Sequence, residues 1–176
     1  MRINYSRVEA ERQNQGDFMM KINRPMREAL NGVRLDLPLS ESLQSIADSG
    51  FELRDECYFL RALLGSTNAS RKSFPDCIGY ECFINSLHVE DYDSASPLTQ
   101  AVLLVKEVFR VWNAMQLPSQ LTAVVSASDS RVVVRFHVRR AGEQWLSDDI
   151  EGYDDPVMSM ESSEDVIASL NVLPKS

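Results

Sequence analysis

A long amphipathic segment near the middle of the chain constrains the fold most. Ser96 and Pro97 are typical of a helix cap and first helical position, and Pro118 indicates where the helix ends. The apolar residues between them recur at helical spacing: Leu98, Ala101, Val102, Val105, Val108, Phe109, Trp112 and Met115. Thr99, Lys106, Arg110 and Asn113 line the opposite, polar side. A stripe this wide favours a core helix over residues 97–116 rather than a membrane-surface helix.

Two alternating segments follow this helix. Residues 120–127 and 131–139 each place apolar side chains at every second position, and Ser128-Asp129-Ser130 separates them. The pattern predicts a hairpin with one apolar face and, on its second strand, a basic face that pairs with acids from a neighbouring segment. Residues 156–161 predict one more strand, and residues 163–170 a short terminal helix capped by Ser162 or Ser163.

The N-terminal half predicts shorter elements. Residues 18–22 alternate as a weak strand, and a short helix opens at Asn23 or Arg24 with Pro25 and closes at Asn31-Gly32. Ser40 is the expected cap of a helix that Gly50 ends. Apolar spacing over residues 51–64 predicts a second helix, 65–76 an exposed loop, and 80–89 a strand.

Together these elements predict an α+β fold. We expect an antiparallel sheet of three to five strands packed by the long amphipathic helix, with a more helical N-terminal part. At 176 residues the chain suits a single domain, residues 1–176, divided into a mainly helical part (1–65) and a sheet-plus-helix part (78–176).

The location of the protein is predicted from what the sequence lacks. The N-terminus has no apolar leader core, and the longest aliphatic run, residues 101–105, is far shorter than the ~20 residues of a membrane span. Cys57, Cys77 and Cys82 are odd in number and show no paired spacing, so we expect reduced, buried thiols. These observations predict a cytoplasmic protein without a membrane partner.

The net charge of −8 lies entirely in the last 36 residues. Residues 141–176 contain one basic residue, Lys175, and nine acids: Glu143, Asp148, Asp149, Glu151, Asp154, Asp155, Glu161, Glu164 and Asp165. A one-signed surface repels nucleic acid and anionic membrane and attracts basic proteins. Alternatively, this segment is only a solvated acidic tail.

No pattern in the chain predicts catalysis or a cofactor. His88 and His137 lie in no nucleophile motif, and the arginines around His137 disfavour its protonation. The cysteines lack zinc-ligand spacing, and the acids of residues 148–155 lack that of a calcium loop. Those acids leave one alternative open, a metal-assisted hydrolase. An acidic chain also argues against nucleic-acid binding.

The acidic segment also carries large aromatic residues. Interface hot spots are enriched in tryptophan and tyrosine, and surrounding acids speed association with a basic partner. The candidate partner-binding residues are Asp148, Asp149, Glu151, Tyr153, Asp154, Asp155 and Trp145. The competing interpretation is that Trp145 and Ile150 only pin an acidic loop to the core.

About 30 residues of this region resemble a known class of proteins. A valine-rich strand, residues 132–140, precedes Gly-Glu-x-Trp-Leu at residues 142–146 and an acidic stretch that ends in Tyr-x-x-Pro-Val at residues 153–157. Within that stretch Asp148, Asp149 and Ile150 also match. This order is similar to the C-terminal part of immunity proteins of bacterial polymorphic and contact-dependent growth inhibition toxins. The resemblance implies a non-catalytic inhibitor that covers the active site of a cognate toxin domain, commonly a basic nuclease at the C-terminus of a CdiA-like or Rhs-like effector. An acidic adaptor with another basic target remains a second alternative.

Overall fold

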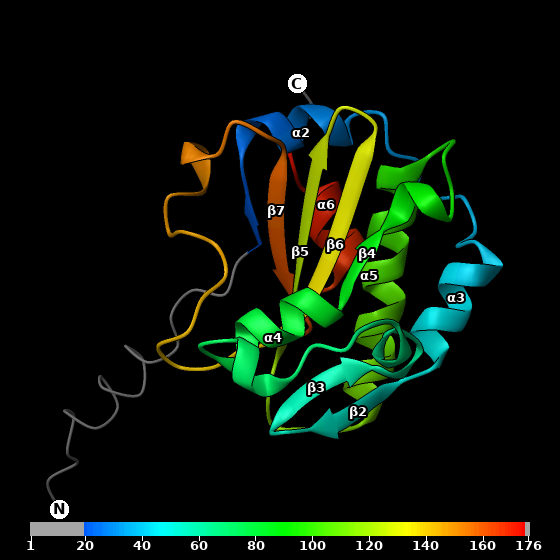
Figure 1. Ribbon diagram of the computed structural model, residues 1–176. Coiled ribbons are helices and arrows are strands. Elements are labelled where there is room, and N and C mark those ends of the chain that lie inside the picture. The colour runs from blue at the N-terminus through cyan, green and yellow to red at the C-terminus, as the bar shows by residue number, and fades with distance from the viewer. Residues whose placement is uncertain (1–19, 175–176) are drawn as a thin grey trace, which may run out of the picture.

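The computed structural model describes residues 20–174, apart from the side chain of Ser66. Its centre is a five-stranded antiparallel sheet with the strand order β1-β7-β5-β6-β4 (Figure 1). The strands are β1 (Lys21–Ile22), β4 (Ser86–His88), β5 (Leu121–Ser128), β6 (Arg131–Val138) and β7 (Val157–Glu161). The α+β class and the hairpin β5–β6 are therefore confirmed. Of the weak strand over residues 18–22, Phe18 and Met19 lie outside the described residues.

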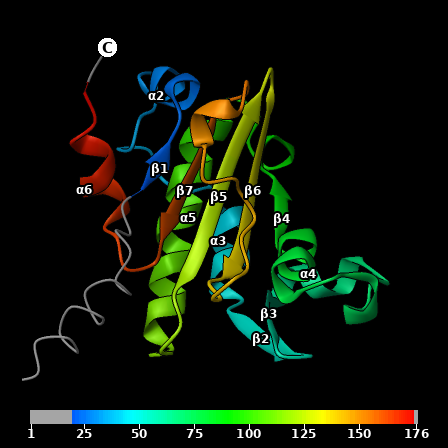
Figure 2. The same ribbon diagram turned by 90° about the vertical axis from the view of Figure 1, so that its left-hand side faces the viewer.

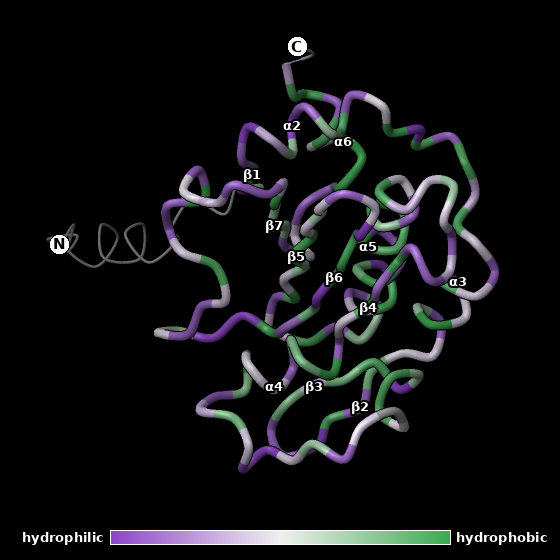
Figure 3. Tube along the Cα trace, turned by 45° about the horizontal axis from the view of Figure 1, so that its top comes forward, coloured by the Kyte–Doolittle hydropathy of each residue, from purple (hydrophilic) through white to green (hydrophobic). Residues whose placement is uncertain are grey.

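Helix α5 (Pro97–Ala114) covers one face of this sheet, with α3 (Glu41–Asp48) beside it (Figure 2). Figure 3 shows hydrophobic stretches along α5 and the central strands, where the main core lies. Trp112 is at its centre: it makes T-shaped ring contacts with Phe51 and Tyr58, and its indole N–H donates to the Ser119 carbonyl at 3.1 Å. The predicted core helix is confirmed.

Three details of that helix differ from the prediction. It ends at Ala114, so Met115 lies beyond it and is exposed rather than buried. Thr99, expected on the polar side, is buried, and its hydroxyl accepts a hydrogen bond from the Arg34 amide at 3.3 Å. Ser96 occupies the cap position but makes no capping hydrogen bond with its side chain.

Residues 51–60 form a hairpin, so the helix predicted over residues 51–64 was wrong. Strands β2 (Phe51–Arg54) and β3 (Cys57–Leu60) pair antiparallel, and a 3-10 helix, η1 (Arg61–Ser66), follows. The turn residues Asp55 and Glu56 have φ angles of 52° and 65°, as a two-residue hairpin turn requires. Leu53, expected on the buried stripe, is 58% exposed.

Residues 77–84 form helix α4 (Cys77–Ile84), so the strand predicted over residues 80–89 was wrong except at β4. Asp76 caps this helix by accepting a hydrogen bond from the Gly79 amide at 2.7 Å. Most of α4 is buried, because it lies between the hairpin β2–β3 and strand β6 (Figure 1). Apolar residues therefore occur on all sides of it and hide the helical period. The preceding loop contains a 3-10 turn, η2 (Arg71–Ser73).

Helices α2, α3 and α6 form at or near their predicted positions. Helix α2 (Arg24–Leu30) begins after Asn23, and α3 begins after Ser40 and is followed by Gly50 at φ +71°, as predicted. Helix α6 (Val166–Asn171) forms near the predicted position, but its cap is Asp165, which accepts from the Ala168 amide at 3.0 Å.

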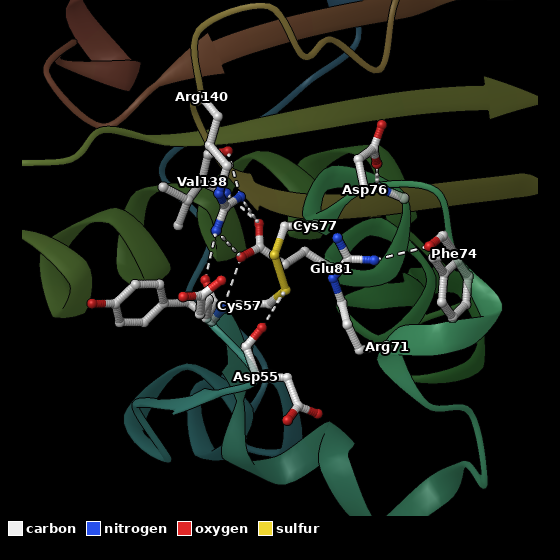
Figure 4. Close-up of a disulfide and its surroundings, with 12 residues drawn as sticks. Asp55, Cys57, Arg71, Phe74, Asp76, Cys77, Glu81, Val138 and Arg140 are labelled. Carbon is white, nitrogen blue, oxygen red and sulfur yellow. Dashed lines mark hydrogen bonds and ion pairs between the residues drawn. A yellow bond between two sulfur atoms is a disulfide. The ribbon is translucent and has the colours of Figure 1, made fainter.

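The cysteines differ from the prediction in one respect. All three are buried as expected, but Cys57 and Cys77 form a disulfide between β3 and α4 (Figure 4). Cys82 is a free thiol whose pKa is raised by burial. The expectation of three reduced thiols was therefore wrong, and the cysteines no longer support a reducing compartment. Within residues 20–174, no helix is both long and apolar enough to cross a membrane.

Candidate protein-binding site

The sheet face opposite α5 carries polar side chains in register. Thr122 on β5 pairs with His137 on β6 and with Glu161 on β7, so the three side chains form one row across adjacent strands. In the neighbouring row Val124 pairs with Arg135 and with Ser159. Side chains in such rows lie about 5 Å from each neighbour. The two rows form the surface beside which the acidic segment runs.

The acidic segment, residues 141–156, leaves β6 and returns to β7 along this outer side of the sheet (Figure 2). It contains a short 3-10 turn, η4 (Ile150–Gly152). Its end is held by Asn23, a buried residue whose side-chain amide donates to the carbonyls of Tyr153 at 3.2 Å and Asp155 at 2.8 Å. The Asn23 Oδ1 atom accepts from the amides of Met26 and Val157. The segment is therefore anchored by the same residue that caps α2.

Two of the predicted acids have basic partners near β1. Glu151 accepts a hydrogen bond from the Arg24 amide at 3.0 Å and lies 3.4 Å from the Arg27 guanidinium. Asp148 lies 3.8 Å from the Lys21 ammonium. Because these pairs are exposed, each contributes only about 0–1 kcal/mol to stability. Their main effect is to fix the path of the segment.

The other predicted acids face solvent. Asp149, Asp154 and Asp155 are exposed, and their carboxylates form no ion pair among the described residues. The structure thus brings all five predicted acids onto one anchored segment and leaves three of them without a basic partner from residues 20–174.

The two predicted aromatic residues are also on this surface. Trp145 is 42% exposed, and the Arg135 guanidinium lies 5.8 Å from its ring centroid. Tyr153 is 36% exposed, and its hydroxyl accepts from the Ser147 amide at 3.0 Å. Both rings are therefore held in place yet partly open to solvent, unlike the buried Trp112. The interpretation that Trp145 only pins the loop accounts for its contact with Arg135 but not for its exposure.

A cavity of about 410 Å³ lies between the start of the acidic segment and the outer face of the sheet. The row of His137, Thr122 and Glu161 lines it together with Glu143 and Trp145 from the segment. Sequence reasoning missed this cavity because its residues come from strands far apart in the chain. The alternation in residues 120–139 placed Thr122 and His137 on one face. The register of β5 with β7, which adds Glu161 to this row, could not be predicted from the sequence.

The titratable groups of the cavity have shifted pKa values. Burial lowers the pKa of His137 to about 4, with Arg140 contributing, so the ring is neutral near pH 7. The predicted disfavouring of its protonation is confirmed, although burial rather than the arginines is the main cause. Burial also raises the pKa of Glu161, against the opposing effect of Arg139.

The arginines at the end of β6 pair with acids other than the exposed ones of the acidic segment. Arg139 lies 3.9 Å from Glu161 on β7. Arg140 makes two hydrogen bonds of 2.9 and 2.8 Å to the fully buried carboxylate of Glu81 on α4 (Figure 4). The arginines at the end of this strand do pair with acids, as predicted. These acids are Glu161 on β7 and Glu81 on α4, rather than any of residues 148–155.

Glu81 was not predicted as a key residue. Its carboxylate also accepts from the amides of Tyr58 on β3 and Val138 on β6, both at 2.7 Å. One turn later Asn85 accepts from the Leu60 amide and donates to the Tyr58 and Phe136 carbonyls. Helix α4 thus joins the hairpin to the sheet edge through side chains spaced i, i+4. The signal in the sequence was an isolated acid and amide within an apolar run.

The described residues offer no arrangement for a metal. No three histidine, cysteine, aspartate or glutamate side chains between residues 20 and 174 lie close enough together to hold an ion. The acids of residues 148–155 do not converge on such a cluster, so the hydrolase alternative gains no support from the geometry.

Comparison with known proteins places the chain in a family. Residues 21–172 match the "Uncharacterized protein PM0498 family", and the chain belongs to it. The protein "Uncharacterized protein PM0498" of Pasteurella multocida (strain Pm70) is 27% identical over 139 residues, which is 71% of this chain and 87% of that protein. No solved structure matches the chain significantly.

Proposed function

We propose that this protein is an immunity protein that binds a cognate toxin domain and neutralises it by covering its active site. The observation that carries the proposal is the acidic segment. A buried asparagine and two ion pairs hold it, while three carboxylates and two aromatic rings on it face solvent.

The charge of this surface defines the partner. Exposed acids around aromatic anchors attract and hold a basic surface, and they repel nucleic acid and anionic membrane. A nuclease toxin domain is a basic surface of this kind, because its substrate is a polyanion. The C-terminal domain of a CdiA-like or Rhs-like effector is therefore the partner that we propose.

The proposal places the protein in the cytoplasm, where such a toxin acts. The disulfide between Cys57 and Cys77 is more typical of an oxidising compartment. The thiols should therefore be trapped by alkylation at the moment of lysis of the native host. A Cys57–Cys77 pair protected from alkylation would agree with the disulfide of the structure and place the protein in an oxidising compartment, whereas alkylation of both cysteines would agree with the proposed cytoplasmic location.

The test of the proposal is protection of growth. The toxin domain encoded directly upstream in the native genome is expressed alone and together with this chain. We expect co-expression to restore growth and the two proteins to co-purify in equal amounts. The matched control is a variant with Asp149→Lys and Asp154→Lys, which should protect less. Failure of the native chain to protect, or the lack of any toxin gene beside it, would reject the proposal in favour of an adaptor with another basic target.

A further inference from the structure

The cavity beside the acidic segment contains hydrogen-bond acceptors that receive no donor from the part of the chain that the structure describes. The Oε2 atoms of Glu143 and Glu161 are buried, and neither has a hydrogen-bond partner among residues 20–174. Buried polar atoms in folded proteins nearly always have a partner, so two orphaned acceptors in one cavity indicate that something is missing. The missing group must be a donor.

His137 adds an independent observation at the same place. Only 6% of this residue is exposed, and it lines the cavity. Its Nδ1 atom lies 3.2 Å from the Val138 carbonyl, which fixes Nδ1 as the protonated nitrogen of a neutral ring. Nε2 is then an acceptor, and it has no hydrogen-bond partner among the described residues. The neutral ring therefore offers Nε2 as a third acceptor for a donor in the cavity.

The positive charges around the cavity do not supply these donors. Arg140 is bound to Glu81, and Lys21 lies beside Asp148. Arg139 faces the other carboxylate oxygen of Glu161, Oε1, at 3.9 Å. The third carboxylate that lines the cavity, Glu164, already accepts from the amides of Met20 and Glu161. The cavity therefore calls for an added cation with several N–H donors.

We propose that this cavity binds a guanidinium group, the side chain of an arginine that the basic partner inserts. A guanidinium is planar and carries five N–H donors, so it can reach several acceptors from one position. Trp145 lines the cavity and already holds one guanidinium, that of Arg135, over its ring, so the same type of contact is available at the entrance. The inference rests on the proposed function only in naming the source of the arginine.

The test uses a small probe rather than the partner. Nα-acetyl-L-arginine N-methylamide is titrated into the ¹⁵N-labelled full chain and followed by NMR. The citrulline counterpart, which has the same shape without the charge, is the matched ligand control, and the lysine counterpart tests for a plain ammonium. We expect saturable binding on the order of millimolar, because the probe is small.

The two tryptophans provide an internal control in the same spectrum. The indole N–H signal of Trp145, assigned with Trp145→Phe, should shift with the backbone amides of Thr122 and Glu161. The indole of Trp112 is buried in the core and should not move. Shifts that spread over the acidic segment without saturating would overturn the inference, because they would show only non-specific attraction.

The variants decide which acceptors matter. Glu161→Gln and Glu143→Gln should each weaken binding of the arginine probe at least tenfold, and the citrulline probe should bind at least tenfold more weakly than arginine. Glu41→Gln removes an equal charge from α3 on another side of the molecule and should change nothing (Figure 1). Dispersed spectra confirm that each variant is folded. Equal binding by both glutamine variants, by citrulline or by lysine would overturn the assignment.

The two proposals can fail separately. If the probe does not bind but the chain protects against the toxin, the guanidinium site is wrong and the immunity function stands. If the probe binds with the expected selectivity but no toxin is neutralised, the site stands and its arginine comes from another basic partner.

Discussion

Glu81 on α4 and Glu161 on β7 are both paired with arginines of the same short segment, but their carboxylates have opposite environments. Glu81 accepts two backbone N–H groups and a two-pronged contact from Arg140, so both of its oxygens are saturated. Glu161 lies beside Arg139 at 3.9 Å, and its Oε2 atom is buried without a donor from residues 20–174. The adjacent arginines thus serve two sites of different kinds.

The contrast separates a structural carboxylate from one available to a ligand. Glu81 joins β3, α4 and β6 and has no remaining capacity to bind anything else. Glu161 belongs to a row of side chains that opens into a cavity under the acidic segment. A buried unsatisfied acceptor costs stability, so its presence in a fold needs an explanation, and the proposed ligand would supply one.

The largest expected effect on stability comes from breaking the ion pair between Arg140 and Glu81. Arg140→Met leaves the buried Glu81 carboxylate without its cation and should reduce the free energy of unfolding by about 3–5 kcal/mol. Arg139→Met, the neighbouring control, should reduce it by less than about 1 kcal/mol, because its ion pair is long and partly exposed. Urea unfolding followed by circular dichroism measures both. Equal losses would mean that the two arginines do not differ in role.

The next effect is a dependence of stability on pH at the cavity. His137 has a folded pKa of about 4, below its ordinary 6.5, so the unfolded chain binds more protons between these values. Stability is therefore lost as pH falls from 6.5 towards 4, by roughly 2–3 kcal/mol from this group. Arg140 and Asp76 are the charges that act on the ring. Glu161 acts in the opposite direction, because its raised pKa favours the folded state on acidification.

The contribution of His137 is isolated by difference. Urea midpoints of the native chain and of His137→Gln are compared at several values between pH 7 and pH 4. The native chain should lose more stability than the variant across this range. Parallel curves would show that the ring is not buried as a neutral group.

The smallest expected effect is at the unsaturated carboxylate. Glu161→Gln removes a charge that burial disfavours and supplies an amide that can donate, so unfolding free energy at pH 7 should stay the same or rise by up to about 1 kcal/mol. Thermal and urea unfolding measure it. A loss above about 2 kcal/mol would place Glu161 with Glu81 as a structural residue.

Parts of the fold with strong local signals were predictable. The helix from Pro97 and the strands around Ser128-Asp129-Ser130 have long, regular periods that tertiary contacts did not override. The hairpin over residues 51–60 was missed because its strands have four residues each, too few to separate the two periods. Helix α4 was missed because it is buried on several sides.

The candidate site was predictable only where it is local. The acids and aromatics of residues 141–156 are close in sequence, so composition was enough to single them out. The cavity depends on the register of β5 with both β6 and β7, which places Thr122 between His137 and Glu161. The disulfide likewise joins cysteines 20 residues apart that only the fold brings together.

The most direct test of a binding role for the acidic segment is the association rate with the cognate toxin domain at low and high salt. The loop variant, Asp149→Lys with Asp154→Lys, is compared with a surface control of equal charge change, Glu41→Lys with Asp91→Lys. Electrostatic steering predicts that the loop variant associates at least tenfold more slowly at low salt and that the difference shrinks at high salt, since exposed charges are screened over about 10 Å at 0.1 M. The surface control should keep nearly the native rate. Identical rates for the loop variant and the native chain at both salt concentrations would contradict the account, because the acids would then be solvent-facing charges without a partner.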